Sequence, residues 1–157
     1  MSNPTDIKTE FETIATAQVG VNTFVYGYPW DLNRQFDITY PLCMLQTIRE
    51  ATYPSRKNKY KVYTIVVGFY DDYLEAEKVG TDWAAKQTEL ETLGIQFLQE
   101  FDSRSQDSGN WYRLTGDSEE LPNAEFMEMK ADQNLAGYEL TFQLQVPDEC
   151  TDGTFNY

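Results

Sequence analysis

The most regular pattern in the chain is an alternation of apolar and polar residues near its C-terminal end. The apolar members are Tyr138, Leu140, Phe142, Leu144 and Val146, and a polar residue lies between each neighbouring pair. Side chains along a strand point alternately to opposite faces, so this pattern predicts a strand with one buried face. The stretch 125–130 precedes it with a turn at 131–137. We therefore predict a β-hairpin whose second strand ends at Pro147.

A second stretch, residues 59–73, is apolar on both faces. Val62, Thr64 and Val66 fall on one side, and Tyr63, Ile65, Val67 and Phe69 fall on the other. Such β-branched and aromatic residues favour strands, and two apolar faces are typical of a strand inside a sheet. This stretch is therefore predicted to be a central strand.

Two other stretches follow the helical period. Near the N-terminus the apolar positions are Ile7, Phe11 and Ile14, which predict a short helix that ends before Gly20. The longer stripe consists of Trp83, Leu90, Leu93, Phe97, Leu98 and Phe101. It predicts the principal helix at about 81–104, with Thr81 and Asp82 offering oxygens that cap its first amides. Gly94 within this helix marks a close approach to the sheet.

The remaining segments are shorter. The aromatic run 23–30 and the alternating run 36–40 predict two strands joined by a turn at 31–34. Residues 41–54 are bounded by prolines and are compatible with either a short helix or a strand, because their periodicity does not decide between them. A short strand is predicted at 111–114.

Together these elements predict an α+β fold. We expect a mixed, mainly antiparallel sheet of about five or six strands, with the helix at 81–104 across one face and the N-terminal helix nearby. A chain of 157 residues fits a single domain spanning 1–157, with a flexible C-terminal tail at about 151–157. The predicted core includes Trp83, Leu90, Phe97, Val66, Leu140 and Phe142.

The charge of the chain disfavours nucleic acid as a partner. With 26 acidic and 12 basic residues the formal net charge is −14, so the average surface repels phosphate. The one basic run consists of Arg56, Lys57, Lys59 and Lys61. It leads into a predicted strand and is more typical of a solvated loop, so we expect no specific nucleic-acid binding.

Membrane insertion and secretion are also disfavoured. No stretch approaches the roughly 20 apolar residues that span a bilayer, and the first residues carry no apolar segment of the kind found in secretion signals.

The residue types needed for common catalytic centres are missing. The sequence contains no histidine, which excludes Ser–His–Asp and Cys–His catalysis and the usual zinc sites. It also lacks the glycine-rich motifs that cradle nucleotide phosphates. Cys43 and Cys150 lie far apart without metal-binding spacing, so thiols are the default, and a disulfide between them stays open. We expect no cofactor.

One acidic cluster follows the predicted central strand. Asp71, Asp72, Glu75 and Glu77 have the chemistry to bind Mg²⁺ or to act as acid and base. The other interpretation is an acidic turn at the end of the strand. Because the chain has 26 acidic residues, such clusters arise by composition alone, and we predict no metal site and no enzymatic activity.

An aromatic segment is the best candidate for an interface. Phe24, Tyr26, Tyr28 and Trp30 alternate along one predicted strand. This composition occurs in protein cores and in the centres of interfaces, and both interpretations stay open. We predict that this segment and the strand edges contact neighbouring copies, with Gln143 and Gln145 supplying polar contacts.

The C-terminal hairpin also carries a short motif, in which an N-L-x-G-Y turn leads into a strand that closes on V-P and a cysteine. The residues are Asn134, Leu135, Gly137, Tyr138, Val146, Pro147 and Cys150. This arrangement resembles the closing hairpin of small virion proteins of tailed bacteriophages, particularly phages of Bacteroidetes hosts. Across residues 20–150, the predicted order of strands, long helix and hairpin is similar to tail-terminator and head–tail connector ring proteins.

The resemblance implies a structural role. Such a protein is a virion subunit, assembled in the host cytoplasm, that forms a homo-oligomeric ring, a hexamer or dodecamer, in the phage neck or tail. It contacts adjacent neck, tail or portal proteins, and the genome passes through its lumen. Acidic walls repel DNA and keep it sliding freely, so the charge is compatible with this position.

Two alternatives come from other classes of protein. One is an acidic protein-binding module or inhibitor that acts on a basic partner. The other is an enzyme that uses Asp71 and Asp72 with a metal ion.

Overall fold

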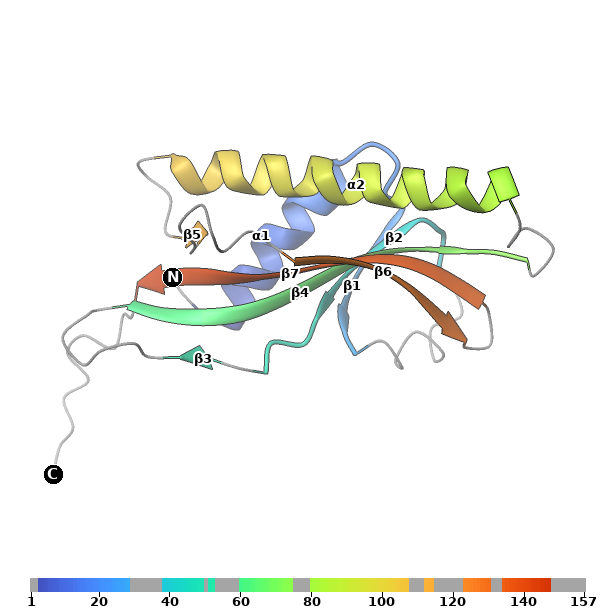
Figure 1. Cartoon of the computed structure of the whole chain (residues 1–157). Helices are drawn as coiled ribbons and strands as arrows, with labels where there is room; N and C mark the ends of the chain where they lie inside the picture. Colours follow the sequence, from blue (N-terminus) through green and yellow to red (C-terminus); the bar gives the residue numbers. More distant parts are fainter. Residues whose placement is uncertain are drawn as a thin grey trace, which may run out of the picture.

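The computed structural model describes residues 3–28, 38–49, 51–52, 60–74, 80–107, 112–114, 123–130 and 134–147. Their fold is α+β, with two helices on one face of a seven-stranded, mainly antiparallel sheet (Figure 1). The predicted fold class is therefore confirmed. The predicted tail at 151–157 lies outside the described residues.

Two long strands form the middle of the sheet. The strands are β1 (Thr23–Gly27), β2 (Leu42–Gln46), β3 (Ala51–Thr52), β4 (Tyr60–Asp72), β5 (Arg113–Leu114), β6 (Asn123–Lys130) and β7 (Asn134–Pro147). β4 and β7 pair antiparallel along their whole shared length. β2 and β3 pair with the other edge of β4, β5 and β6 pair with the other edge of β7, and β1 pairs parallel with β2. The predicted central strand, hairpin and short strand are all present. The turn predicted at 131–137 is too long, because residues 134–137 already pair with β6 as part of β7.

The two helices begin differently, and only the start of α1 has a described cap. α1 (Pro4–Ala17) starts at Asn3, whose side chain accepts a hydrogen bond from the Asp6 amide at 3.0 Å, while Asp6 accepts one from the Asn3 amide at 3.3 Å. This reciprocal capping box satisfies amides that the first turn leaves free. α2 (Gly80–Gln106) starts at Gly80, which has a φ of 63°. The predicted capping residues Thr81 and Asp82 therefore lie within its first turn.

The main core lies between the helices and the sheet. The rings of Phe11 on α1 and Phe101 on α2 have centroids 4.9 Å apart, and both approach Phe142 on β7. Of the predicted core residues, four are buried: Leu90, Phe97, Leu140 and Phe142. α2 comes close to the sheet at Gly94, where a Cβ atom would lie 2.6 Å from the Tyr138 ring. The close approach predicted at Gly94 is thus confirmed.

Two core predictions need correction. Val66 is half-buried on the opposite face of the sheet, because it alternates with Ile65 and Val67, which point toward the helices. Trp83 is also only half-buried, since it lies in the first turn of α2 and packs at the rim of the core against Tyr73.

The segment before β2 also differs from the prediction. Of the predicted strand at 36–40, the described residues 38–40 are not a strand. Ile38 and Tyr40 instead pack against a second apolar cluster on the far face of the sheet, which contains Val25, Met44 and Tyr70. The open choice for 41–54 resolves as strand at β2, which is buried on both faces because Cys43 and Leu45 lie in the main core and Leu42 and Met44 lie in the second cluster. Of the helices in the described ranges, none is long and apolar enough to cross a membrane.

Candidate interaction surface

The sheet face opposite the helices carries an uncharged strip along its two longest strands. The members are Val62, Thr64 and Val66 on β4, and their cross-strand partners Gln145, Gln143 and Thr141 on β7. None of these side chains has a charge, and we call this set the neutral strip. Gln143 is exposed and the other five are half-buried. In a chain with a net charge of −14, six adjacent neutral side chains on one face form a distinct surface.

A polar cluster adjoins the neutral strip where the two long strands continue. The Tyr70 hydroxyl donates a short hydrogen bond to Oε1 of Glu139, and Nε2 of Gln46 donates to the same oxygen at 3.0 Å. Burial raises the pKa of the Glu139 carboxyl, and the carboxylate of Glu125, its cross-strand neighbour, raises it further. Burial and the Glu139 carboxylate likewise raise the pKa of the Tyr70 phenol. The fold therefore places the Glu139 carboxyl in a site that disfavours its charged form.

Two glycines make room for Tyr70. The Tyr70 ring would collide with a Cβ atom at Gly68, and its Cδ1 atom would lie 2.6 Å from one at Gly137. The ring thus lies flat over the two central strands, and its hydroxyl reaches Glu139. The sequence pattern did not reveal this cluster, because its members are distant along the chain. The sequence feature that points to it is a glycine in each of the two stretches with the clearest strand pattern, Gly68 and Gly137, because a glycine inside a strand leaves room for a neighbouring side chain.

The acidic pair after the central strand has an internal partner. Nζ of Lys86 on α2 lies 3.3 Å from Oδ2 of Asp71 and donates to the backbone oxygen of Asp72 at 2.7 Å. Burial raises the pKa of the Asp71 carboxyl, as does its hydrogen bond with Asp72, whereas Lys86 lowers it. These contacts tie the end of β4 to α2. Glu75 and Glu77 lie outside the described residues, and within the described ranges no group of three potential ligands is placed to hold a metal ion.

The predicted interface residues separate onto two faces of the sheet. Phe24 and Tyr26 are half-buried against the main core on the helix side. Gln143 and Gln145 belong to the neutral strip on the other side. The guanidinium of Arg49 lies 4.5 Å from the centre of the Tyr28 ring. Trp30 lies outside the described residues.

Cys43 is a buried free cysteine, and its burial raises the pKa of the thiol. The other cysteine, Cys150, lies outside the described residues. So do Arg56, Lys57 and Lys59 of the basic run, whose described member Lys61 lies over the ring of Tyr63.

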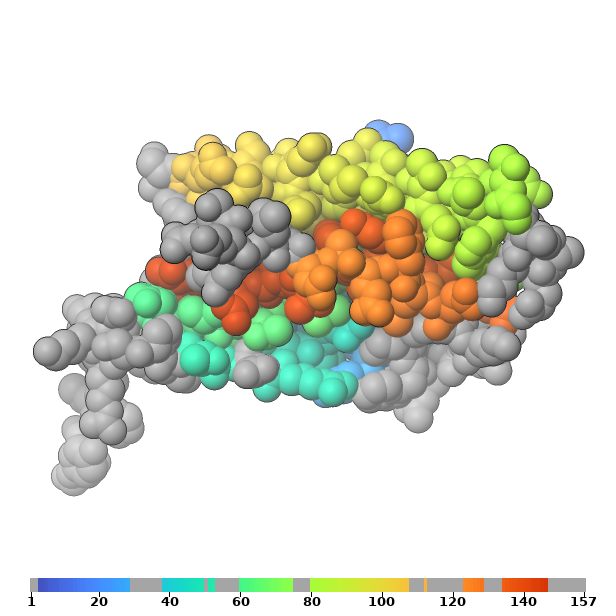
Figure 2. Space-filling view, viewed as in Figure 1, coloured from blue at the N-terminus to red at the C-terminus, as the bar shows by residue number. Residues whose placement is uncertain are grey.

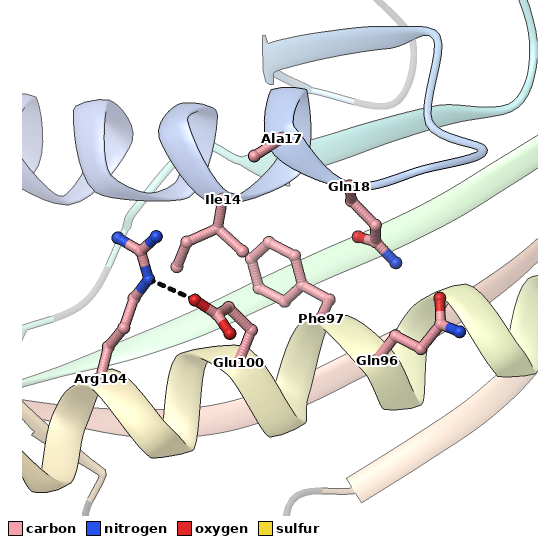
Figure 3. Close-up of a pocket in the computed structure, with 7 residues that line it drawn as sticks. All are labelled: Ile14, Ala17, Gln18, Gln96, Phe97, Glu100 and Arg104. Carbon is pink, nitrogen blue, oxygen red and sulfur yellow. Dashed lines mark hydrogen bonds and ion pairs between the residues drawn. The ribbon is translucent and has the colours of Figure 1, made fainter.

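A hollow of about 280 Å³ lies between the two helices (Figure 3). It is lined by Ile14, Ala17, Gln18, Gln96, Phe97, Glu100 and Arg104. Its polar side chains largely bind one another or the helices. Arg104 pairs with Glu100 at 2.8 Å and with Glu10 at 3.2 Å, and Nε2 of Gln18 donates to the backbone oxygen of Leu93 at 2.8 Å. The Arg104–Glu10 and Gln18–Leu93 contacts join α1 to α2, whereas the Arg104–Glu100 pair lies within α2.

No protein-family model matches the sequence, and no curated protein matches it either.

Proposed function

We propose that this chain is a structural virion protein, a subunit of a homo-oligomeric ring in the neck or tail of a tailed bacteriophage. In this role it joins the capsid portal to the tail and lets the genome pass. The resemblance of the C-terminal hairpin motif to small virion proteins suggests the class. The α+β fold, with helices on one face of the sheet, is consistent with it.

The observation that carries the proposal is the neutral strip. Copies of a chain with a net charge of −14 repel one another, so a stable ring needs contact surfaces from which charge is removed. The neutral strip supplies such a surface on the longest strand pair of the fold, β4 and β7. Its valines and threonines offer apolar area, and its glutamines are uncharged polar side chains of a kind that protein interfaces accept.

The remaining acidic surface fits the proposed position around DNA. A lumen wall that repels phosphate does not retain the genome, so we propose no specific nucleic-acid binding. We also propose no catalysis and no cofactor. The acidic pair at the end of β4 is accounted for by its contact with Lys86.

The first test is the composition of purified particles. We expect the chain to be present at a fixed ratio to portal and tail proteins, as measured by quantitative mass spectrometry. A chain that is absent from particles, but captures one basic protein in a complex that salt weakens, would instead be the acidic inhibitor.

The second test compares two identical substitutions. Gln143→Glu places a charge on the neutral strip, whereas Gln99→Glu places the same charge on an exposed position of α2. Both variants should fold, because both side chains are exposed. We expect Gln143→Glu to reduce incorporation into particles and Gln99→Glu to leave it unchanged. Equal incorporation of both would remove the neutral strip from the proposed contacts.

A further inference from the structure

The sheet has one long edge without a described neighbour. β6 pairs with β7 through all eight of its residues, from Asn123↔Thr141 to Lys130↔Asn134, and no described strand lies on its other side. Figure 2 shows the orange atoms of β6 at the surface below α2. The register advances without a bulge, so the outer backbone groups of β6 form a regular row.

The side chains of this edge are suited to a contact. Phe126 is 42% exposed, and its ring lies 5.0 Å from that of Tyr138. Ala124 and Glu125 beside it are exposed as well. Proteins protect an edge with proline, a bulge, a very short strand or charged side chains. β6 has no proline, no bulge and eight residues, and its charged members are Glu125, Glu128 and Lys130. A long, regular edge with an exposed aromatic ring is still a template for another strand, provided that the partner places no acidic side chain against Glu125 and Glu128.

We propose that β6 pairs with β1 of a second copy of this chain. Charge decides between the two obvious partners. If β6 paired antiparallel with β6 of another copy about a central two-fold axis, Glu125 and Glu128 would face each other across the contact, and opposed like charges destabilise a strand pair. β1, with the sequence TFVYG, carries no charged side chain. Its five residues cover most of the length of β6.

The two strands also lie at opposite ends of the sheet. The order runs β1-β2-β4-β7, with β6 beyond β7, and β1 pairs with β2 alone among the described strands. A β6-to-β1 contact joins two different surfaces, so each copy keeps a free edge for the next one. Repeated head-to-tail contacts of this kind close into a ring when the rotation between neighbouring copies closes, and otherwise they form an open filament. The inference thus deepens the proposed function, on which its ring geometry rests, and adds a second contact between copies beside the neutral strip.

The test places a photo-crosslinking benzoylphenylalanine at Phe126 in the full chain. The probe is itself an extended phenylalanine, so the exposed site should accept it, and circular dichroism checks the fold. Labelled and unlabelled copies are mixed, so that mass spectrometry separates links between copies from links within one. We expect a covalent dimer whose link joins position 126 of one copy to residues 23–27 of another, in particles and in concentrated purified protein.

Two comparisons make the result decisive. The same probe at Gln99, on the exposed surface of α2, should give no link to residues 23–27. A probe at Ala124, exposed on the same edge, repeats the measurement if the Phe126 variant does not fold. A link from β6 to β6, a link only to a different protein, or the absence of any link between copies would each overturn the inference.

The same data distinguish the inference from the proposed function. If the chain is missing from particles while the purified protein still gives the β6-to-β1 link, the phage role fails and the edge contact stands. If the chain is in particles but the link lies elsewhere, the edge contact fails and the phage role stands.

Discussion

The placement of Tyr70 shows how single residues shape the far face of the sheet. Its ring occupies space that only glycine at positions 68 and 137 leaves free. Gly137 belongs to the N-L-x-G-Y motif through which the chain resembles virion proteins, but it lies within β7, paired with Tyr70 and Met127, so this part of the motif has a packing role inside the molecule. This glycine alone therefore says little about a partner, and the proposed function depends on the neutral strip instead.

Glu139 should make the stability of the protein depend on pH. Its pKa is raised in the folded state, so the folded protein holds this proton more tightly than the unfolded chain does. The fold is therefore favoured at low pH, and this contribution is lost as pH rises from the unfolded pKa through the raised folded one. Glu139→Gln removes the titration and keeps an oxygen for Tyr70. We expect it to increase the free energy of unfolding at neutral pH, with the gain disappearing toward pH 4, as measured by urea denaturation across pH.

Tyr70→Phe tests the same hydrogen bond from the donor side, by the same urea denaturation. It removes the hydroxyl that donates to Glu139 but keeps the ring over the two glycines. Loss of a hydrogen bond to a charged group should cost about 1.5–3 kcal/mol at neutral pH. A double variant with Glu139→Gln should lose less, because the acceptor that no longer receives the Tyr70 hydroxyl is then uncharged. Equal losses in both backgrounds would show that the hydroxyl and the carboxylate are not coupled.

Gly94→Ala tests the close approach of α2 to the sheet. Alanine favours a helix over glycine by about 1 kcal/mol, so on an open helix face this change stabilises. Here the new Cβ would lie 2.6 Å from the buried Tyr138 ring, and overpacking of this kind costs about 1–3 kcal/mol. We expect no net gain and as much as about 2 kcal/mol of net loss in thermal or urea denaturation. In a Tyr138→Ala background the same change should stabilise, and if it does not, the contact is wrongly placed.

At the scale of elements, the two faces of β4 should differ in their contribution to stability. Phe97 on α2 is buried among the rings above β4, so Phe97→Ala should cost about 3–5 kcal/mol. Val66 points to the open face and is half-buried, so Val66→Ala should cost about 1 kcal/mol or less. Chemical denaturation of both variants checks the assignment. Similar losses would mean that the far face of the sheet is as buried as the helix side.

The sequence predicted those elements whose burial is one-sided. β7 alternates and α2 has one apolar stripe, because each meets the core on a single side. β2 is buried on both sides, so it carries no period and its sequence does not separate strand from helix. For the same reason the pattern of β4 did not reveal which face the helices cover, and Val66 was assigned to the wrong one. The cluster of Tyr70, Gln46 and Glu139 forms only through strand pairing, which local patterns do not encode.

At the scale of the whole molecule, the enzyme alternative has a direct test. Asp71→Asn combined with Asp72→Asn keeps side-chain size and removes both charges. Their loss weakens a contact in which the side chains of Lys86 and Asp71 are only 18% and 16% exposed, so stability should fall by about 1.5–3 kcal/mol. A ring subunit should still fold and give infectious particles in a plaque assay. If the variant folds but particles lose a metal-dependent activity, the structural role must be abandoned.

The net charge predicts how association between copies responds to salt. Each copy carries −14, so contact through the neutral strip or through β6 brings two strongly acidic bodies together. Raising the salt from about 0.01 M to about 1 M shortens the Debye length from about 30 Å to about 3 Å and screens this repulsion. Self-association of the purified protein, measured by sedimentation, should therefore strengthen with salt, since the neutral contacts themselves are little screened. Gln143→Glu should weaken association most at low salt, where the added charge is least screened, and Gln99→Glu should have less effect. Association that instead weakens as salt rises would show that opposite charges hold the copies together, and the neutral surfaces would lose their proposed role.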